Sequence, residues 1–337
     1  MDASSQVAIT GVTGFVGTAL AERLRAAGHR VRGLVRATSH GETVAWLEQL
    51  GVELVRGDLH DRAALRRLAD GTDLLVHSAA VIGYRRRLWG AMARTNVLGT
   101  RNVVDAALEA GVGRMVHVSS IAAIGVTDTP ELQDETSPWT GDRLDAAYFD
   151  TKREAELETA KGAARGLDVV TVNPGAIYGP SRAVSNSSNV VATIVRRRPG
   201  FIPAGGINVV TLETVLGGIL AAAQRGRPGR RYVLGGENLH LHELVTRVGA
   251  AADLALYPRP LPTWWAPAAR GAMELVEPLV PDRVWFTPDM CSCFGRWMWF
   301  DNTRAREELG VVPDSLDDCL VATVEQLRRA RRLPPLD

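Results

Sequence analysis

The chain has 337 residues, of which 46% are hydrophobic and 23% are charged, and its formal net charge is +1. This composition is typical of a folded globular protein, so it excludes a disordered or fibrous chain. The balanced charge gives no indication that nucleic acid or an anionic membrane is a partner.

Short apolar, β-branched runs alternate with helical patterns along the first half of the chain. They predict strands at 6–10, 30–35, 52–56, 73–77, 114–118 and 168–172, and helices at about 14–27, 88–110 and 145–164. Further helices are expected at 187–197 and 213–225, and further strands at 207–210 and 231–234, before helical pieces broken by prolines. Strands that alternate with helices build a parallel sheet covered on both faces. We therefore predict an α/β fold, a doubly wound parallel sheet with a smaller, mostly helical C-terminal lobe.

A glycine-rich loop joins the first predicted strand to the first predicted helix. Three glycines at this spacing permit a tight turn, a close approach of backbone to a pyrophosphate, and close packing of helix on strand. The helix start also offers free N–H groups and a positive dipole end. The alternative is a turn with packing duties only. The loop predicts a dinucleotide site formed by Gly11, Thr13, Gly14, Phe15, Val16 and Gly17.

The predicted domains follow from this loop. Residues 1–173 and 207–234 are expected to form the dinucleotide-binding domain, and residues 174–206 and 235–337 a substrate-binding lobe.

The end of the second predicted strand bears on the choice of cofactor. NAD sites commonly place an acidic residue there to bind the ribose 2′-hydroxyl. No Asp or Glu lies between Gly28 and Gly41, and Arg36 occupies the strand end instead. A guanidinium suits a 2′-phosphate, so NADP(H) is favoured while NAD(H) stays open. The alternative is a solvated arginine.

Tyr148 and Lys152 lie four residues apart in the predicted helix at 145–164, so phenol and ammonium share one helical face. Lysine is rare in this chain, where Lys152 and Lys161 are the two examples. An adjacent ammonium is expected to lower the phenol's pKa, and the pair can then exchange a proton with a carbinol oxygen. The alternative is a surface lysine beside a core tyrosine.

Ser119 and Ser120 follow the strand at 114–118. Hydroxyls at the carboxyl end of a parallel strand open into the ligand crevice, where one can hydrogen-bond a substrate oxygen. The alternative is a pair of serines that satisfies a turn.

Several segments together resemble the extended short-chain dehydrogenases/reductases of the NAD(P)-dependent epimerase/dehydratase type. They are TGVTGFVG at 10–17, GDL at 57–59, HSAA at 77–80, TNVLGT at 95–100, VHVSS at 116–120, YFDTK at 148–152 and NPGAIYGP at 173–180. Within the family, the chain is most similar to the branch of dihydroflavonol-reductase-like, 3β-hydroxysteroid-dehydrogenase-like and hopanoid-associated proteins. That closer similarity lies in GGIN at 205–208, RYVLGGENL at 231–239 and AREELG at 305–310.

The resemblance implies a Rossmann fold and cofactor contacts for matched residues. Asp58 would bind the adenine amino group, and Leu59 would flank that ring. Ala79 and Ala80 would pass beneath the cofactor, and Pro174 would lie at the nicotinamide carboxamide. Tyr148 and Lys152 would also contact the cofactor, Lys152 at the nicotinamide ribose.

The resemblance implies catalytic roles as well. Ser120 matches the family's catalytic serine better than Ser119, Tyr148 would be the acid/base, and Asn96 would support the site. Sugar-nucleotide dehydratases carry Asp-Glu after the catalytic residue, whereas Ile121 and Ala122 follow here, which argues against a dehydratase.

Three functions are weighed. The favoured one is an NADP(H)-dependent oxidoreductase that interconverts a ketone or aldehyde and an alcohol on a mainly hydrophobic substrate. A sugar-nucleotide epimerase with tightly bound NAD and a non-catalytic dinucleotide sensor are the alternatives. Tryptophans of the last quarter of the chain suggest a hydrophobic substrate. Two alternatives are that they form the core of the C-terminal lobe, or that they make a membrane-surface or dimer contact. The tryptophans are Trp264, Trp265, Trp285, Trp297 and Trp299, with Phe286 among the residues that join them.

The remaining expectations concern surroundings. A small-molecule substrate is expected and a metal site is not, because Cys291 and Cys293 lack a second cysteine pair. No apolar run is long enough to span a membrane, and no signal peptide is evident. The sparse cysteines indicate free thiols and a cytoplasmic location. A homodimer stays open.

Overall fold

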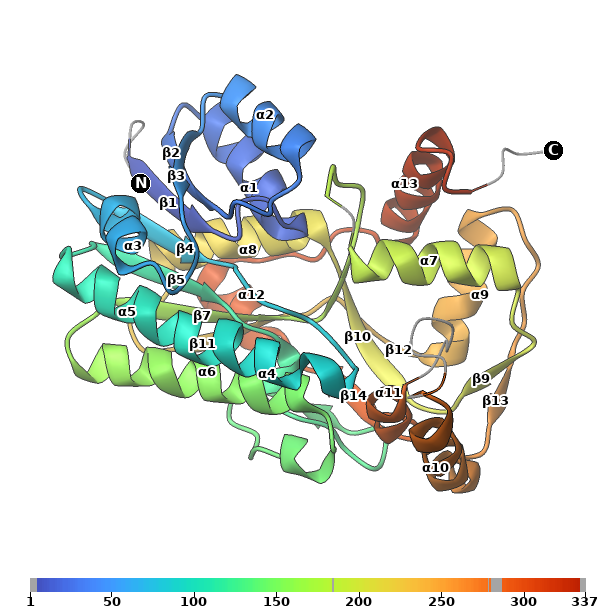
Figure 1. Ribbon diagram of the computed structural model, residues 1–337. Coiled ribbons are helices and arrows are strands. Elements are labelled where there is room, and N and C mark those ends of the chain that lie inside the picture. The colour runs from blue at the N-terminus through green and yellow to red at the C-terminus, as the bar shows by residue number, and fades with distance from the viewer. Residues whose placement is uncertain (1–4, 184, 278, 280–286, 334–337) are drawn as a thin grey trace.

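A seven-stranded parallel sheet forms the centre of the protein (Figure 1). The computed structural model describes residues 5–183, 185–277, 279 and 287–333. The strands are β1 (Gln6–Thr10), β2 (Arg30–Val35), β3 (Glu53–Arg56), β4 (Leu74–His77), β5 (Arg114–Val118), β7 (Val169–Pro174) and β11 (Arg231–Leu234). Their order is β11-β7-β5-β4-β1-β2-β3, and every neighbouring pair is parallel. The strand order reverses between β1 and β4, which is the switch point of a doubly wound sheet. The predicted α/β fold is confirmed.

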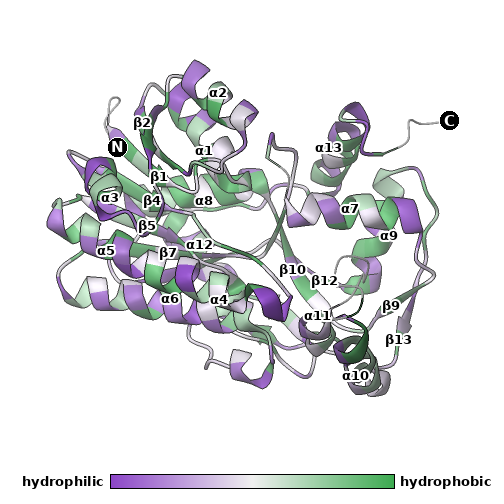
Figure 2. Ribbon diagram, viewed as in Figure 1, coloured by the Kyte–Doolittle hydropathy of each residue, from purple (hydrophilic) through white to green (hydrophobic). Residues whose placement is uncertain are grey.

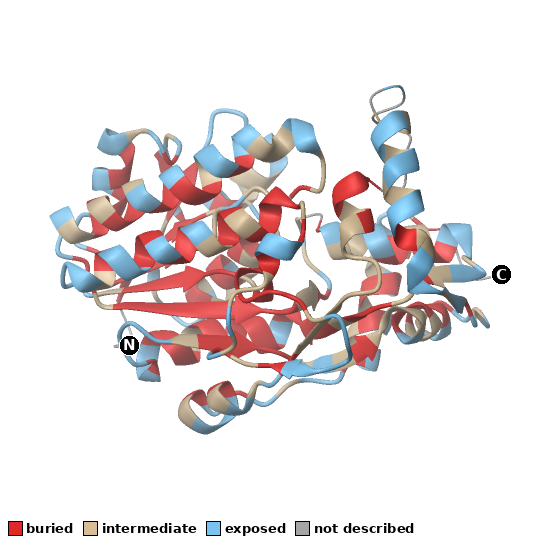
Figure 3. Cartoon of the chain, turned by 90° about the horizontal axis from the view of Figure 1, so that it is seen from below, coloured by how far each residue is buried: buried red, intermediate tan, exposed pale blue. Residues whose placement is uncertain are grey.

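Helices cover both faces of this sheet. One face packs against α1 (Phe15–Ala26), α2 (Gly41–Gln49), α8 (Leu212–Arg225) and α12 (Thr303–Leu309), and the other against α3 (Arg62–Ala69), α5 (Gly99–Glu109) and α6 (Ala147–Ala164). Along β1, Val7 and Ile9 join the first core and Ala8 joins the second, as strand alternation requires. The strands are apolar and buried, whereas the outward helix faces are polar and exposed (Figures 2 and 3). This burial of branched residues on both faces explains why the strands read as continuous apolar runs.

A second sheet joins the C-terminal portion to the first. Its strands are β12 (Glu237–His240), β10 (Gly206–Thr211), β14 (Trp297–Phe300), β6 (Leu132–Gln133) and β8 (Ala176–Tyr178), and β9 (Phe201–Pro203) pairs separately with β13 (Arg259–Leu261). The helices of this portion are α7 (Asn186–Arg197), α9 (Leu241–Ala251), α10 (Ala266–Val276), α11 (Pro288–Ser292) and α13 (Leu316–Arg329). Side chains of α7, α9 and α13 form a separate core with the second sheet.

Three details differ from the sequence-based expectations. The helix expected at 88–110 contains α4 (Trp89–Met92), a π-helical segment (Ala93–Leu98) and α5. Helices α2 and α3 were not individually predicted. The strand expected at 207–210 belongs to the second sheet. The division into two domains stays a prediction. Among the described residues, no helix is long and apolar enough to cross a membrane.

Candidate active site

The candidate site lies along the carboxyl ends of six parallel strands. The segments after β1, β2, β3, β4 and β5 and the last residue of β7 carry most of the predicted site residues, and Asn96, Tyr148 and Lys152 lie on helical segments. Because neighbouring strands are parallel, these ends meet at one edge of the sheet, where ligands of doubly wound folds bind.

The glycine loop has the tight backbone that a phosphate-binding turn needs. Gly11 has a φ of +74°, and a Cβ placed there would lie 2.7 Å from the backbone nitrogen of Ala79. A Cβ on Gly17 would lie 2.1 Å from the carbonyl oxygen of Gly11. Gly14 is the residue before α1, whose first turn contains no acidic side chain. The loop therefore fits a dinucleotide, since backbone N–H groups at the helix start face the crevice without a competing carboxylate.

Arg36 lies directly beyond β2 in a turn closed by Ser39, whose backbone nitrogen donates to the Arg36 carbonyl at 3.0 Å. The side chain is exposed, and among the described residues its guanidinium has no hydrogen-bond or ion-pair partner. Asp58 is also exposed, and its Oδ1 accepts hydrogen bonds from the backbone of His60 and Asp61. An unpartnered cation at this strand end can bind a phosphate.

The other predicted cofactor residues occupy the same edge. Leu59 is buried, with Ala79 packed against its cluster, and Ala80 is exposed. Pro174 is the last residue of β7 and pairs with Leu234 of β11. Thr13, Phe15 and Val16 are partly buried at the start of α1.

Ser120, Tyr148 and Lys152 lie near the carboxyl end of β5. The Tyr148 ring is 8% exposed, and the Ser120 side chain lies close enough to its hydroxyl to lower the pKa of the phenol. The Ser120 oxygen also accepts a hydrogen bond from the Ala122 backbone at 3.1 Å. Lys152 is buried, and its Nζ donates to the Val118 carbonyl at 3.1 Å. By contrast, the buried Ser119 hydroxyl has no hydrogen-bond partner among the described residues.

The pKa values of Lys152 and Tyr148 are both shifted by burial, and the shift of Tyr148 differs from the expectation. Burial lowers the pKa of Lys152 to about 8, and Glu156 acts in the opposite direction. Burial raises the pKa of Tyr148, and the nearby Ser120 side chain opposes that rise. The expected lowering of the Tyr148 pKa is therefore wrong for the protein alone, because the cost of burying a phenolate is the largest contribution.

Asn96 lies in the π-helical segment and is nearly fully buried. Its Oδ1 accepts from the Val81 backbone at 2.8 Å, and its Nδ2 donates to the Val81 carbonyl at 2.9 Å and to Thr151 at 3.2 Å. The side chain therefore ties the segment after β4 to the helix that carries Tyr148. Single π-helical turns are frequent at functional sites because they redirect one side chain.

Two buried histidines beside Lys152 were not singled out from the sequence. His77 and His117 stack with ring centroids 5.5 Å apart. Burial, reinforced by Lys152, lowers the pKa of both rings, that of His77 to about 3. Thr10 and Thr100 hydrogen-bond the two nitrogens of His77, at 2.6 and 2.9 Å. The rings are thus neutral near neutral pH and sit beneath Lys152 without adding positive charge.

An apolar cluster surrounds Tyr148. The Tyr84 ring lies 5.9 Å from the Tyr148 ring, and Phe149 packs edge-on against Tyr148. The side chains around them come mostly from the N-terminal half, and Cys293 and Met298 come from the C-terminal portion. Its members include Met92, Ala122, Val126, Leu144, Ala146 and Ala147, with Val81, Leu88, Trp89 and Trp139 packed against them.

The described C-terminal tryptophans do not lie together in one cluster. Trp297 and Trp299 lie in β14 of the second sheet, Trp265 packs against Phe294, and Trp264 is 80% exposed. Trp285 and Phe286 lie outside the described residues. That these aromatic side chains contact a hydrophobic substrate stays a prediction.

Comparisons with known proteins agree with this architecture. The model of the NAD dependent epimerase/dehydratase family matches residues 7–199. A putative dihydroflavonol 4-reductase of Synechocystis is 32% identical over 94% of this chain and 92% of its own. A 4-hydroxy-2-methyl-3-oxo-4-farnesyl-3,4-dihydroquinoline-1-oxide ketoreductase of Stigmatella aurantiaca is 31% identical over 90% of both chains.

A solved structure is similar as well. A nucleoside-diphosphate-sugar epimerase of Pseudomonas aeruginosa superposes with a TM-score of 0.76 at 26% identity, covering 98% of this chain and 99% of that one. The fold, the glycine loop and these similarities agree. The chain is an enzyme of the NAD-dependent epimerase/dehydratase family, with an NAD(P) cofactor.

Proposed function

We propose that this protein is an NADP(H)-dependent oxidoreductase that interconverts a ketone or aldehyde and an alcohol on a mainly hydrophobic substrate. The observation that carries the proposal is the proximity of Ser120 to the hydroxyl of Tyr148, whose ring lies in an apolar cluster, with Lys152 buried on the same helix. The cofactor supplies or accepts the hydride when bound.

The side chains have distinct roles in this proposal. Ser120 donates a hydrogen bond to the substrate oxygen, and Tyr148 donates its proton to that oxygen during reduction. Lys152 holds positive charge near the phenol and binds the nicotinamide ribose. The raised pKa of Tyr148 suits a proton donor, because the phenol stays protonated at neutral pH. Asn96 keeps the segment after β4 in register with α6.

The proposed cofactor residues extend along the crevice. The pyrophosphate binds the loop Gly11–Gly17, and Arg36 binds the 2′-phosphate of NADP(H) because its guanidinium is exposed and unpartnered among the described residues. Asp58 and Leu59 contact the adenine, Ala79 and Ala80 pass beneath the cofactor, and Pro174 lies at the carboxamide.

Two observations support an uncharged substrate. Apolar and aromatic side chains surround Tyr148. The cationic side chains after β4 already pair with carboxylates: Arg85 with Glu277 at 3.4 Å, and Arg86 with Asp145 at 2.6 Å. A sugar nucleotide needs free cations for its diphosphate. The name of the Stigmatella aurantiaca relative, a ketoreductase of a farnesylated quinoline, points the same way.

A sugar-nucleotide epimerase is the second candidate, favoured by the similarity to the Pseudomonas aeruginosa epimerase structure. The experiment that separates the two is a substrate screen with purified protein and NADPH, using aryl ketones, steroids and aldehydes in one series and sugar nucleotides in another. Net oxidation of NADPH with an apolar carbonyl supports the reductase. Interconversion of two sugar nucleotides without net redox supports the epimerase.

We also propose the cytoplasm as the compartment, since Cys291, Cys293 and Cys319 are free thiols. A homodimer is a further proposal, which a sedimentation measurement tests.

A further inference from the structure

A chain of buried polar contacts runs behind Ser120. Glu156 lies one helical turn after Lys152 on α6 and is 8% exposed. Its Oε1 accepts a hydrogen bond from Asn173 Nδ2 at 2.5 Å. The same Nδ2 donates to the main-chain carbonyl of Ser120 at 2.9 Å. One amide group of β7 therefore joins the carboxylate of α6 to the backbone of the serine.

The other oxygen of this carboxylate is also engaged. Arg231 of β11 forms an ion pair with Glu156 Oε2 at 3.3 Å, and its Nε donates to the Glu135 carbonyl at 2.9 Å. A buried carboxylate needs such partners to remain ionised. Glu156 thus joins the outermost strand of the sheet to the active-site helix.

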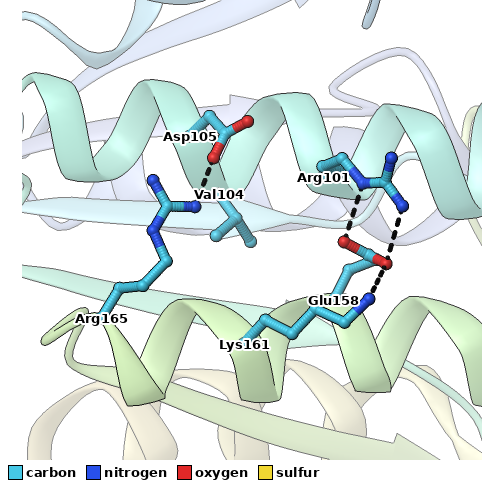
Figure 4. A pocket seen from close by; sticks show the side chains of 6 residues that line it. All are labelled: Arg101, Val104, Asp105, Glu158, Lys161 and Arg165. Atoms are coloured by element: carbon cyan, nitrogen blue, oxygen red, sulfur yellow. Dashed lines mark hydrogen bonds and ion pairs between the residues drawn. The ribbon is translucent and has the colours of Figure 1, made fainter.

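A second buried carboxylate on α6 provides a comparison. Glu158 is 6% exposed, but it lies in the pocket between α5 and α6 and binds Arg101 and Lys161 at 2.9 and 2.7 Å (Figure 4). Within the described part of the chain, no hydrogen bond or ion pair joins Arg101 or Lys161 to a predicted site residue. The two carboxylates share a helix and a degree of burial, so they differ chiefly in what they contact.

We propose that Glu156 is a positioning residue of the active site, acting through Asn173 on the backbone of Ser120 and through its charge on Lys152. The inference rests on the proposed function, because it assumes that Ser120 and Lys152 take part in the reaction.

The effect of Glu156 on Lys152 depends on the other titratable groups near Lys152. The titratable groups around Lys152 are Glu156 and Tyr148 on α6, His77 at the end of β4, and His117 on β5. Burial lowers the pKa of both histidines and raises that of Tyr148, so all three are neutral near neutral pH. Glu156 is the carboxyl group of this set, and its charge raises the pKa of Lys152. Removing that charge moves the Lys152 titration to lower pH.

The first test reads Lys152 directly and needs no substrate. The chain has two lysines, so Lys161→Arg leaves one lysine signal in the full-length protein labelled with ¹³C at lysine Cε. In this background, Glu156→Gln is expected to lower the titration midpoint of Lys152. Glu154→Gln makes the same change at an exposed position of α6 and is expected to leave the midpoint unchanged, as is Glu158→Gln. An unchanged midpoint in Glu156→Gln overturns the proposal.

The second test measures turnover. Glu156→Gln is expected to lower kcat at least about tenfold with a small change in KM for NADPH, because a hydrogen bond to an ionised group is lost. The alkaline limb of the kcat profile moves to lower pH, since activity requires protonated Lys152. Glu156→Asp keeps the negative charge, so the alkaline limb of its kcat profile is expected at the wild-type pH. Its kcat stays below that of the wild type, because the shorter side chain loses the hydrogen bond to Asn173.

If Glu156→Gln does not fold, Glu156→Asp decides the matter: a lowered kcat with an unmoved Lys152 midpoint supports the proposal, and a wild-type kcat overturns it. Tyr148→Phe is measured in parallel. An active Tyr148→Phe refutes the proposed function itself. An inactive Tyr148→Phe beside a Glu156→Gln that matches wild type refutes only the role of Glu156.

Discussion

Tyr148→Phe removes one oxygen atom from a buried ring and leaves its packing in place. Wild-type Tyr148 is 8% exposed and packs against Phe149 and Tyr84, contacts that a phenylalanine keeps. The lost hydroxyl is the proposed proton donor, and general acid–base catalysis contributes about 10²–10⁴-fold. At about 1.4 kcal/mol per tenfold change, the barrier rises by about 3–6 kcal/mol.

The effect on cofactor binding is expected to be small. The glycine loop and Arg36 lie outside the contacts of the Tyr148 hydroxyl, and Lys152 keeps its bond to the Val118 carbonyl. The assay measures initial rates of NADPH oxidation with an apolar ketone, and the Kd of NADPH by fluorescence. Tyr84→Phe is the matched control, because it removes a second phenol from the same cluster. Wild-type turnover in Tyr148→Phe, or an equal loss in Tyr84→Phe, refutes the assignment.

Three further predictions concern the cofactor and the serines. Arg36→Ala weakens NADPH binding by roughly tenfold or more and leaves NADH binding unchanged, since a bond to a charged group contributes about 1.5–3 kcal/mol; equal wild-type Kd values for the two cofactors contradict this. Ser120→Ala lowers kcat by about 10²-fold or more. Ser119→Ala removes a hydroxyl with no hydrogen-bond partner among the described residues and leaves kcat within a few-fold of the wild type. A larger loss of kcat in Ser119→Ala than in Ser120→Ala would show that Ser119 is the functional serine. Gly17→Ala abolishes NADPH binding or lowers the Tm by several degrees, because the added Cβ would lie 2.1 Å from the Gly11 carbonyl oxygen. A wild-type Kd for NADPH together with a wild-type Tm, both measured by calorimetry, would rule out the close approach.

The central sheet was predictable because its strands are buried on both faces. The runs at 114–118 and 231–234 coincide with β5 and β11. The second sheet was not predictable, since β6 has two residues and β8 has three, and such pairings depend on contacts distant in sequence. Helices α2 and α3 were missed because they are short, with nine and eight residues.

The site was predictable where spacing alone determines proximity. Tyr148 and Lys152 share a helical face by their spacing, and the end of β5 places Ser120 at the crevice. The contact between Glu156 and Asn173 was not predictable, because their hydrogen bond joins α6 to β7 across the packed interface. The predicted direction of the Tyr148 pKa was wrong, because the extent of burial around a side chain is a property of the fold and here outweighs the opposing effect of Ser120.

The fate of the cofactor during turnover distinguishes a reductase from an epimerase most directly. Purified protein is dialysed, supplied with NADPH and an aryl ketone or steroid, and followed by the absorbance of NADPH together with the yield of alcohol. A reductase releases any bound cofactor on dialysis and then oxidises one NADPH for each alcohol formed. Tightly retained NAD⁺ that does not exchange, with interconversion of a sugar-nucleotide pair and no net oxidation, would contradict the reductase proposal.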